Sequence, residues 1–222
     1  MAEVNLSFDI SENLSQRILQ WEYPPGHRLT EEGLCSEFAV SRSPVREALG
    51  TLVERGLVEK SARQGYTVRR LDLDEIKESY DVRVVLERAV IDRLCEVGAD
   101  PDILDALEAR WVQLRDGLPA LSPRAADEDE HFHRVLAEAA GNRVLARTLA
   151  EIDARIHFVR LSDITNTERL RQTCLDHLKI IDALRRRDRT TAAEALRRNI
   201  EWGKNNVETA IRDALMRAHL GR

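Results

Sequence analysis

Residues 40–49 read VSRSPVREAL, and this stretch has the features of a short amphipathic helix that begins after a bend. Either of its serines can act as the N-cap. Pro44 is tolerated in the first turn, because the N–H group that proline lacks would be unpaired there. Arg42 and Arg46 are four residues apart and therefore share one face of the helix. The opposite face is apolar and consists of Val45, Ala48, Leu49 and Leu52. The pattern predicts a helix that packs by one side and presents two guanidinium groups on the other.

The flanking residues predict a small mixed domain around this helix. Residues 10–21 carry apolar side chains at helical spacing and stop just before two consecutive prolines. Thr30 can cap a short second helix. Downstream, residues 57–60 and 66–69 are β-type runs separated by turn residues, which is typical of a two-stranded hairpin. Three helices and a hairpin within about 60 residues describe a winged helix-turn-helix.

From Leu71 onward the apolar residues keep a helical period, and strand signals are missing. The fold class is therefore predicted to be mainly α. A winged helix-turn-helix domain occupies residues 1–70, and an all-α bundle of about six helices occupies residues 71–222. The bundle helices are expected to begin near Asp72, Pro101 and Ser122 and to span residues 143–162, 166–186 and 190–216.

The composition agrees with a helical protein and excludes several classes. The 222 residues include 33% charged and 43% hydrophobic side chains, which excludes a disordered tail and a membrane protein. Aromatic residues, at 5%, are few for an all-β fold. The N-terminal stretch carries acids where a secretory signal would be basic and then apolar. The cysteines are odd in number and widely spaced, so neither a disulfide framework nor a cysteine metal clip is expected. These features predict a cytoplasmic protein with no membrane partner.

Charge is distributed unevenly along the chain. The formal net charge is −5 overall, and residues 1–40 alone carry −5. Residues 41–70 carry seven basic and three acidic side chains, a net charge of +4. A local basic region in an acidic protein is what one phosphate-binding face requires.

The quoted motif resembles the DNA-binding domain of the GntR family of bacterial transcriptional regulators, and the similarity runs from about residue 18 to residue 68. Three further stretches resemble the helical FCD domain of the FadR subfamily: YDVRVVLE at 80–87, DEHFHRVLAEAAGN at 129–142 and DHLKIIDAL at 176–184. Together the resemblance covers about nine tenths of the chain. It implies a homodimer that binds double-stranded operator DNA and responds to a small effector, such as a sugar acid or a hydroxy acid.

The predicted DNA contacts combine side-chain chemistry with this resemblance. An arginine at the start of a recognition helix can pair two donors with the acceptor edge of guanine. Serine hydroxyls beside free helix N–H groups suit a phosphate oxygen. The resemblance adds a wing tip that enters the minor groove. The residues expected at DNA are Ser41, Arg42, Ser43, Arg46, Gln64 and Gly65. The alternative is a solvated face whose arginines pair with Glu47 or Glu54.

The second helix departs from the family pattern. Some family members have a basic residue early in this helix that also contacts DNA. Here residues 30–33 read TEEG, so a DNA contact is not expected from this turn.

Asp129 and His133 are spaced four residues apart, so a carboxylate and an imidazole share one helix face and can hold one metal ion. Asp127 and His131 offer a competing register. We favour the first pair because His133 keeps phase with apolar residues that face the bundle.

The resemblance extends this pair to a metal site of one aspartate and three histidines. His177 matches the second histidine of that set, but Asn199 stands where the third would fall and is a doubtful fourth ligand. An amide oxygen is a poorer ligand than imidazole for Zn or Ni. Three interpretations stay open: a divalent metal site, a metal-free effector site, or polar residues that satisfy one another in the core.

Two arginines are candidates for effector binding. Arg83 precedes Glu87 by four residues, which by itself indicates a surface ion pair. The resemblance implies instead that Arg83 points into the cavity and grips an effector carboxylate as a bidentate fork. Arg160 is a second candidate, and Asn199 a third.

Two other function classes explain the sequence less well than regulation does. A metal-dependent hydrolase could use the Asp/His cluster to activate water, but the residue spacing supplies no further base or oxyanion donor. An architectural DNA-binding protein would have no use for a polar cluster inside an apolar bundle. We therefore expect a regulator and not an enzyme.

Overall fold

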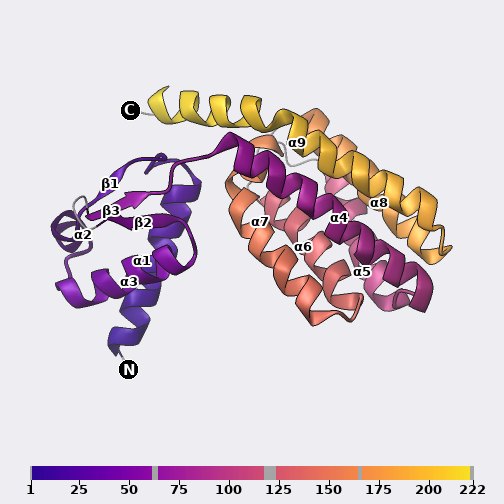
Figure 1. Cartoon of the computed structure of the whole chain (residues 1–222), viewed down its shortest axis with the longest axis horizontal. Helices are drawn as coiled ribbons and strands as arrows, with labels where there is room; N and C mark the ends of the chain where they lie inside the picture. The colour runs from indigo at the N-terminus through magenta and orange to yellow at the C-terminus, as the bar shows by residue number, and fades with distance from the viewer. Residues whose placement is uncertain (1, 62–64, 118–123, 165–166, 221–222) are drawn as a thin grey trace. The chain divides into compact units, whose positions relative to one another are not determined.

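The computed structural model describes residues 2–61, 65–117, 124–164 and 167–220, and the chain divides into two compact units. One unit comprises Met1–Asp72 with Arg212–Arg222, and the other comprises Leu73–Ile211. The described residues form nine helices and three short strands (Figure 1). The predicted fold class, mainly α with a winged helix-turn-helix and an all-α bundle, is confirmed.

The first unit contains a helix-turn-helix with a small sheet. Its three strands are antiparallel in the order β1-β3-β2. The elements are α1 (Ala2–Leu19), β1 (Arg28–Leu29), α2 (Glu31–Phe38), α3 (Arg42–Glu54), β2 (Val58–Ser61) and β3 (Gly65–Val68).

Two sequence predictions for this unit need correction. Helix α1 starts at Ala2 and not at residue 10, because residues 6–9 continue the helix without adding to its buried stripe. The predicted two-stranded hairpin is a three-stranded sheet, since β1 pairs Arg28 with Thr67 and Leu29 with Tyr66. A strand of two residues is too short to show a period-two pattern.

The core of the first unit explains the orientation of α3. Helix α1 packs on α3, and buried leucines such as Leu14, Leu49 and Leu52 meet between them. Tyr66 and Val68 of β3 close the same cluster. Burying this stripe turns the opposite face of α3 towards solvent.

The ends of α2 are set by two local features. Thr30 caps the helix by accepting a hydrogen bond from the Gly33 N–H at 3.1 Å. A Cβ atom at Gly33 would lie 2.8 Å from the Thr30 hydroxyl oxygen, so the glycine leaves room for this cap. The helix ends at Ala39 in the left-handed region, with φ 54°, and this residue begins the bend to α3. Ser41 is the N-cap of α3, and its side chain makes no capping hydrogen bond.

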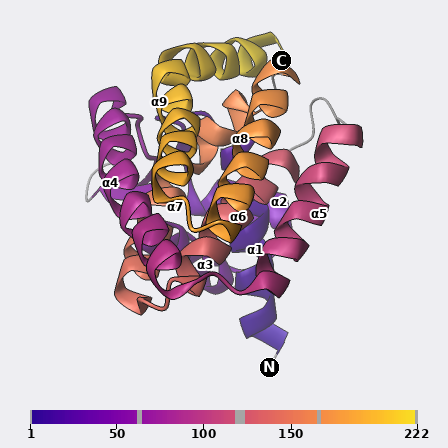
Figure 2. The ribbon, with the colours of Figure 1, turned by 90° about the vertical axis from the view of Figure 1, so that its right-hand side faces the viewer.

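The second unit is a helical bundle. Helix α8 packs against α5 and α4, and α6 packs against α7, α4 and α5 (Figure 2). The elements are α4 (Leu73–Val97), α5 (Pro101–Gly117), α6 (Arg124–Ala139), α7 (Arg143–Asp163), α8 (Thr167–Arg185) and the part of α9 (Arg189–Leu220) up to Ile211. Within the described residues, we find no helix long and apolar enough to cross a membrane.

Large apolar side chains fill the bundle interior, among them Trp111, Phe132 and Ile180. Helix α9 approaches α4 closely at Gly203, where an added Cβ would lie 3.1 Å from the Tyr80 ring. Buried ionisable residues also lie inside the bundle, and they form the candidate site described next.

Candidate DNA interface and candidate metal centre

Helix α3 exposes the residues predicted to contact DNA. Ser41, Arg42, Ser43 and Arg46 are all exposed, whereas Val45 on the opposite side is fully buried. The start of α3 therefore presents two hydroxyls and two guanidinium groups on its exposed side. Gly65 opens β3 with φ 75°, a conformation that favours glycine. Gln64 lies outside the described residues.

Arg46 has a partner that the sequence did not suggest. Its Nε donates a hydrogen bond to Glu31 Oε2 at 2.8 Å, so the arginine pairs with α2 and not with Glu47 or Glu54. Glu47 instead accepts a long hydrogen bond of 3.4 Å from the Ser43 hydroxyl.

The second site lies inside the bundle, where Asp129 and His133 of α6 meet His177 of α8. The three side chains are almost completely buried, with exposed fractions of 3%, 3% and 0%. One ligand atom from each lies within 4.8 Å of the others. Asp129 Oδ1 is 3.8 Å from His133 Nε2 and 3.4 Å from His177 Nε2. None of these three atoms has a hydrogen-bond partner, which is unusual for buried polar groups.

Glu87 of α4 fixes the ring of His133. Its Oε2 lies 2.5 Å from His133 Nδ1. Burial would raise the pKa of Glu87, but the neighbouring Arg83 and His133 lower it to about 2. Glu87 is therefore an ionised acceptor and Nδ1 is the donor, so Nε2 is the ring nitrogen that faces Asp129. A carboxylate behind a histidine in this manner is common at metal sites.

Aromatic side chains hold His177. Its ring stacks on Phe132 at 3.9 Å between centroids and meets the edge of Trp111 at 4.1 Å. Neither ring nitrogen has a hydrogen-bond partner. Burial lowers the pKa of His177 well below its ordinary value, although Asp129 opposes this effect. The neutral imidazole is the form that binds metal.

The competing register lies elsewhere on α6. Asp127 is exposed, and His131 Nδ1 lies 2.9 Å from Arg134 Nη2 at the surface. The structure therefore brings Asp129 and His133 to His177 and leaves Asp127 and His131 apart from that cluster.

Two buried arginines adjoin the cluster. Arg83 donates a hydrogen bond to Glu87 at 2.6 Å, so this pair exists, but it is buried and the surface interpretation is wrong. Arg83 Nε also lies 3.5 Å from Asp153 Oδ1. Arg160 reaches the same Asp153 oxygen at 3.1 Å and Asp129 Oδ2 at 3.4 Å. Asp153 thus lies between the two guanidinium groups.

We call the group of side chains just described, from Arg83 and Glu87 of α4 to His177 of α8, the chamber. Its charges favour a cation. Four carboxylates, those of Glu87, Asp129, Glu130 and Asp153, contact the guanidinium groups of Arg83 and Arg160, so acidic groups outnumber the two arginines that they pair with. Burial would raise the pKa of Asp129, but Arg160 and the two histidines hold it well below its ordinary value. An ionised carboxylate and two imidazoles with unpartnered atoms are a donor set that fits a divalent transition metal.

The predicted fourth ligand is less well defined. Asn199 of α9 is buried, its side-chain nitrogen has no hydrogen-bond partner, and its backbone carbonyl accepts a bond from Arg169 at 3.1 Å. Its part in a metal or effector site stays a prediction.

Sequence reasoning missed other members of the chamber, namely Asp153 and the pair between His157 and Glu130, in which Nδ1 and Oε1 lie 2.5 Å apart. It named Glu87 only as a surface partner. Helical spacing within α4 links Arg83 to Glu87, but the contact with α6 joins residues 46 positions apart. A pattern within one helix does not report such a contact.

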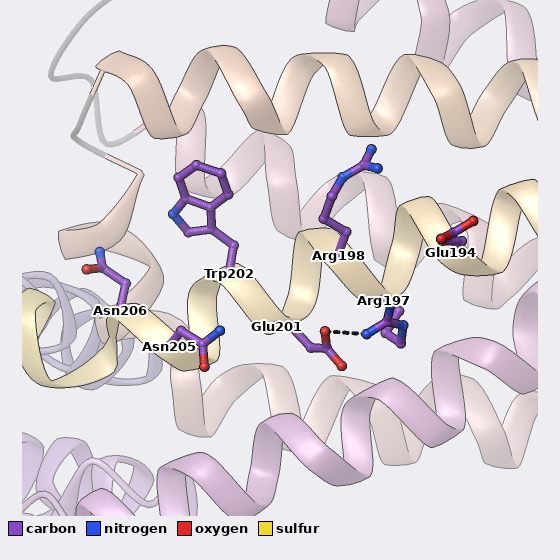
Figure 3. A pocket seen from close by; sticks show the side chains of 7 residues that line it. All are labelled: Glu194, Arg197, Arg198, Glu201, Trp202, Asn205 and Asn206. Atoms are coloured by element: carbon purple, nitrogen blue, oxygen red, sulfur yellow. Dashed lines mark hydrogen bonds and ion pairs between the residues drawn. The ribbon is translucent and has the colours of Figure 1, made fainter.

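A separate open groove of about 400 Å³ lies along α9. Figure 3 shows Trp202 and Arg198 on one side of this helix and Glu201 and Asn205 on the other. Arg198 pairs with the buried Asp176, and Arg197 pairs with Glu201 at 2.6 Å. These charges satisfy one another locally, so the groove adds no ligand to the buried cluster.

Comparisons with known families cover both units. Residues 78–201 match the FCD domain, and residues 6–68 match the bacterial regulatory proteins of the gntR family.

Relatives with a described role are regulators. The chain is 27% identical to the Nta operon transcriptional regulator of Aminobacter aminovorans over 197 residues, which covers 89% of this chain and 92% of the relative. It is also 27% identical to the gluconate operon transcriptional repressor of Bacillus subtilis, over 94% of this chain and 87% of the relative.

Solved structures agree in fold. E. coli McbR/YncC matches with a TM-score of 0.69 at 19% identity, over 92% of this chain and 97% of that protein. A GntR regulator from Rhodococcus sp. RHA1 matches with a TM-score of 0.66 at 24% identity, over 92% of this chain and 98% of that protein. The chain resembles DNA-binding regulators and not enzymes, so the hydrolase alternative is not supported. The chain belongs to the GntR family of bacterial regulatory proteins and carries an FCD domain.

Proposed function

We propose that this protein is a FadR-type dimeric regulator that binds operator DNA through α3 and senses a small carboxylate in the FCD domain. The observation that carries this proposal is the buried cluster of Asp129, His133 and His177, whose facing atoms have no hydrogen-bond partner. A helical domain with only a structural role would not gain from leaving such atoms unpaired.

At DNA, the start of α3 enters the major groove. Arg46 and Arg42 read base edges, and the exposed hydroxyls of Ser41 and Ser43 contact phosphate oxygens. The wing residues Gln64 and Gly65 approach the minor groove. One short helix reads few bases, so a two-fold dimer doubles the contacts and an inverted repeat is the expected operator.

In the bundle, Asp129, His133 and His177 would hold a divalent cation such as Zn or Ni, with Asn199 or water beside them. A bound cation would supply the positive charge that makes this chamber attractive to a carboxylate. Arg83 and Arg160 bind the effector carboxylate through their guanidinium N–H groups, of which Arg83 Nη2 has no hydrogen-bond partner here.

Effector binding controls DNA binding through a difference in affinity. If the effector binds one arrangement of the dimer better than another, it shifts the population towards that arrangement and changes operator affinity. The size of the response cannot exceed the difference in effector affinity between the two arrangements.

The test uses the purified full chain. It is dialysed against a chelator, its metal content is measured, and its unfolding midpoint is recorded with a panel of small organic acids, with and without Zn. We expect Zn to bind at about one equivalent per chain and to increase the stabilisation by at least one acid. His133→Ala should lose both effects, whereas Asp92→Ala, which breaks an exposed ion pair on α4, should keep them. If Zn neither binds nor changes the response to any acid, the metal part of the proposal is wrong. If no acid stabilises the protein in either state, effector sensing is wrong.

A further inference from the structure

Helix α2 begins with two glutamates that differ in their surroundings. Glu31 Oε2 accepts a hydrogen bond from Arg46 Nε of α3 at 2.8 Å. Glu32, the next residue, is exposed, and the described part of the chain offers it no hydrogen bond or ion pair. Of these two acids in the same turn, only Glu31 contacts a residue that we propose reads DNA.

The contact engages Arg46 by one edge only. A guanidinium group has five N–H donors in a planar fork, and the bond through Nε leaves the two terminal nitrogens available for a second planar partner. The side chain of Arg46 is 59% exposed and that of Glu31 is 26% exposed, so the acid is the more enclosed partner. The terminal edge of Arg46 is thus directed by Glu31 while it stays open to solvent. Guanine, with O6 and N7 side by side, is the base that such an edge recognises.

The position of Glu31 is itself fixed by the fold. Thr30 caps α2 directly before it, and the absence of a side chain at Gly33 leaves room for that cap. The carboxylate therefore starts from a defined helical turn and not from a loose loop.

We propose that Glu31 is a positioning residue for operator recognition: it holds Arg46 through Nε and aims the terminal nitrogens at a guanine in the major groove. This inference rests on the proposed function of α3. Phosphates repel a glutamate, so Glu31 acts on DNA through Arg46 and makes no attractive contact of its own. Glu31 also keeps Arg46 from binding a phosphate in place of a base. An arginine that rotates freely would turn towards the negative electrostatic potential of the phosphates.

A purely structural role makes a different prediction. Both glutamates lie in the first turn of α2, where negative charge stabilises the helix N-terminus. If this were all that Glu31 does, replacing Glu31 or Glu32 would have the same effect on the helix and on DNA binding. If Glu31 positions Arg46, only its replacement changes base preference.

The experiment begins with the wild-type full chain, which selects duplexes from a randomised pool. Base preferences of Glu31→Ala, Glu31→Gln and Glu32→Ala are then measured on the selected sequence and on its single base-pair variants. We expect Glu31→Ala to lose discrimination by about 5- to 10-fold at one base pair per half-site, which is part of the discrimination of a bidentate arginine–guanine pair. Glu31→Gln keeps an acceptor for Arg46 Nε and should retain most of the wild-type base discrimination. Glu32→Ala should keep the wild-type preference while gaining as much affinity for non-specific DNA as Glu31→Ala does. Matching unfolding midpoints confirm that each variant is folded.

Two results with the single variants would overturn the inference while leaving the proposed function intact. One is an equal change of preference in Glu31→Ala and Glu32→Ala. The other is tighter operator binding by Glu31→Ala with unchanged preference, which would mean that Glu31 withholds Arg46 from DNA. In an Arg46→Ala background, Glu31→Ala should have no further effect on preference, and an added loss would also contradict the inference. If the wild-type chain selects no duplex at all, the proposed function fails and the inference fails with it.

Discussion

Glu87 on α4 and His133 on α6 are joined by a buried contact of 2.5 Å between Oε2 and Nδ1. The contact fixes which ring nitrogen carries the proton and leaves the other facing Asp129. Replacing the carboxylate by an amide removes its negative charge and adds an N–H donor beside the remaining carbonyl acceptor, so this tautomer is no longer selected. We therefore expect Glu87→Gln to weaken Zn affinity by about 10- to 100-fold.

A competition assay with a chromogenic chelator measures this effect directly. Glu96→Gln is the matched control, because Glu96 is an exposed acid on the same helix. Equal Zn affinity for Glu87→Gln and the wild type would show that Glu87 has no part in metal binding.

Arg46→Ala tests the docking of α3 on DNA. The substitution removes a bidentate donor, so operator affinity should fall by about 1–3 kcal/mol and specificity at one base pair should relax. Arg88→Ala, which removes an exposed arginine of the FCD domain paired with Asp92, should leave operator affinity unchanged. Electrophoretic mobility or fluorescence anisotropy at fixed salt compares the two variants. Undiminished operator binding by Arg46→Ala would refute this arrangement.

Tyr23 predicts a dependence on high pH. Burial and the hydrogen bond to Glu37 raise its pKa to about 12, although the nearby Arg17 opposes the shift. In an unfolded chain the pKa is about 10. The folded state therefore favours the protonated phenol, and this stabilisation is complete below pH about 10 and is lost as the pH rises towards about 12.

Tyr23→Phe removes this titration. The free energy of unfolding of the wild type should therefore fall faster than that of Tyr23→Phe across the same pH window, and the ultraviolet difference between the two should show one phenol ionising near pH 12. A parallel decline of both proteins would exclude this assignment.

Ala39→Gly should stabilise the first unit. Ala39 has φ 54°, a left-handed conformation that costs free energy in any residue with a Cβ. Glycine relieves this cost, and we expect a gain of about 0.5–1 kcal/mol in chemical denaturation. Ala89→Gly, at an exposed position inside α4, should instead lower stability by a similar amount. A loss of stability in both variants would contradict the role given to the bend.

The sequence predicts the elements of the fold well where a regular apolar pattern extends over many residues. The six bundle helices and α3 follow from apolar spacing and from helix-start signals such as Pro101, whereas the N-cap role of Asn142 came from the structure. Strand β1 was missed because two residues carry no period. Gln64, at the predicted wing tip, lies outside the described residues, so its role rests on the resemblance alone.

The candidate site was predictable only in part. Asp129 and His133 were paired by their spacing on one helix, and His177 was added by the resemblance to the family. Asp153 and the role of Glu87 could not be read from the sequence, because each contacts residues on another helix. The same reason explains Glu31, whose bond to Arg46 joins two helices across 15 positions. Spacing reports neighbours along one helix, whereas partners across helices follow from packing.

The close approach of Gly203 to Tyr80 has a practical consequence for engineering. Because an added methyl group would lie 3.1 Å from the Tyr80 ring, the missing side chain of Gly203 sets the spacing of α9 and α4 at this level. Changes at Gly203 would alter the spacing of the two helices, and changes at Tyr80 would also alter the electrostatic surroundings of Arg160. A library that aims to turn this protein into a biosensor with a new ligand range could start from these two positions.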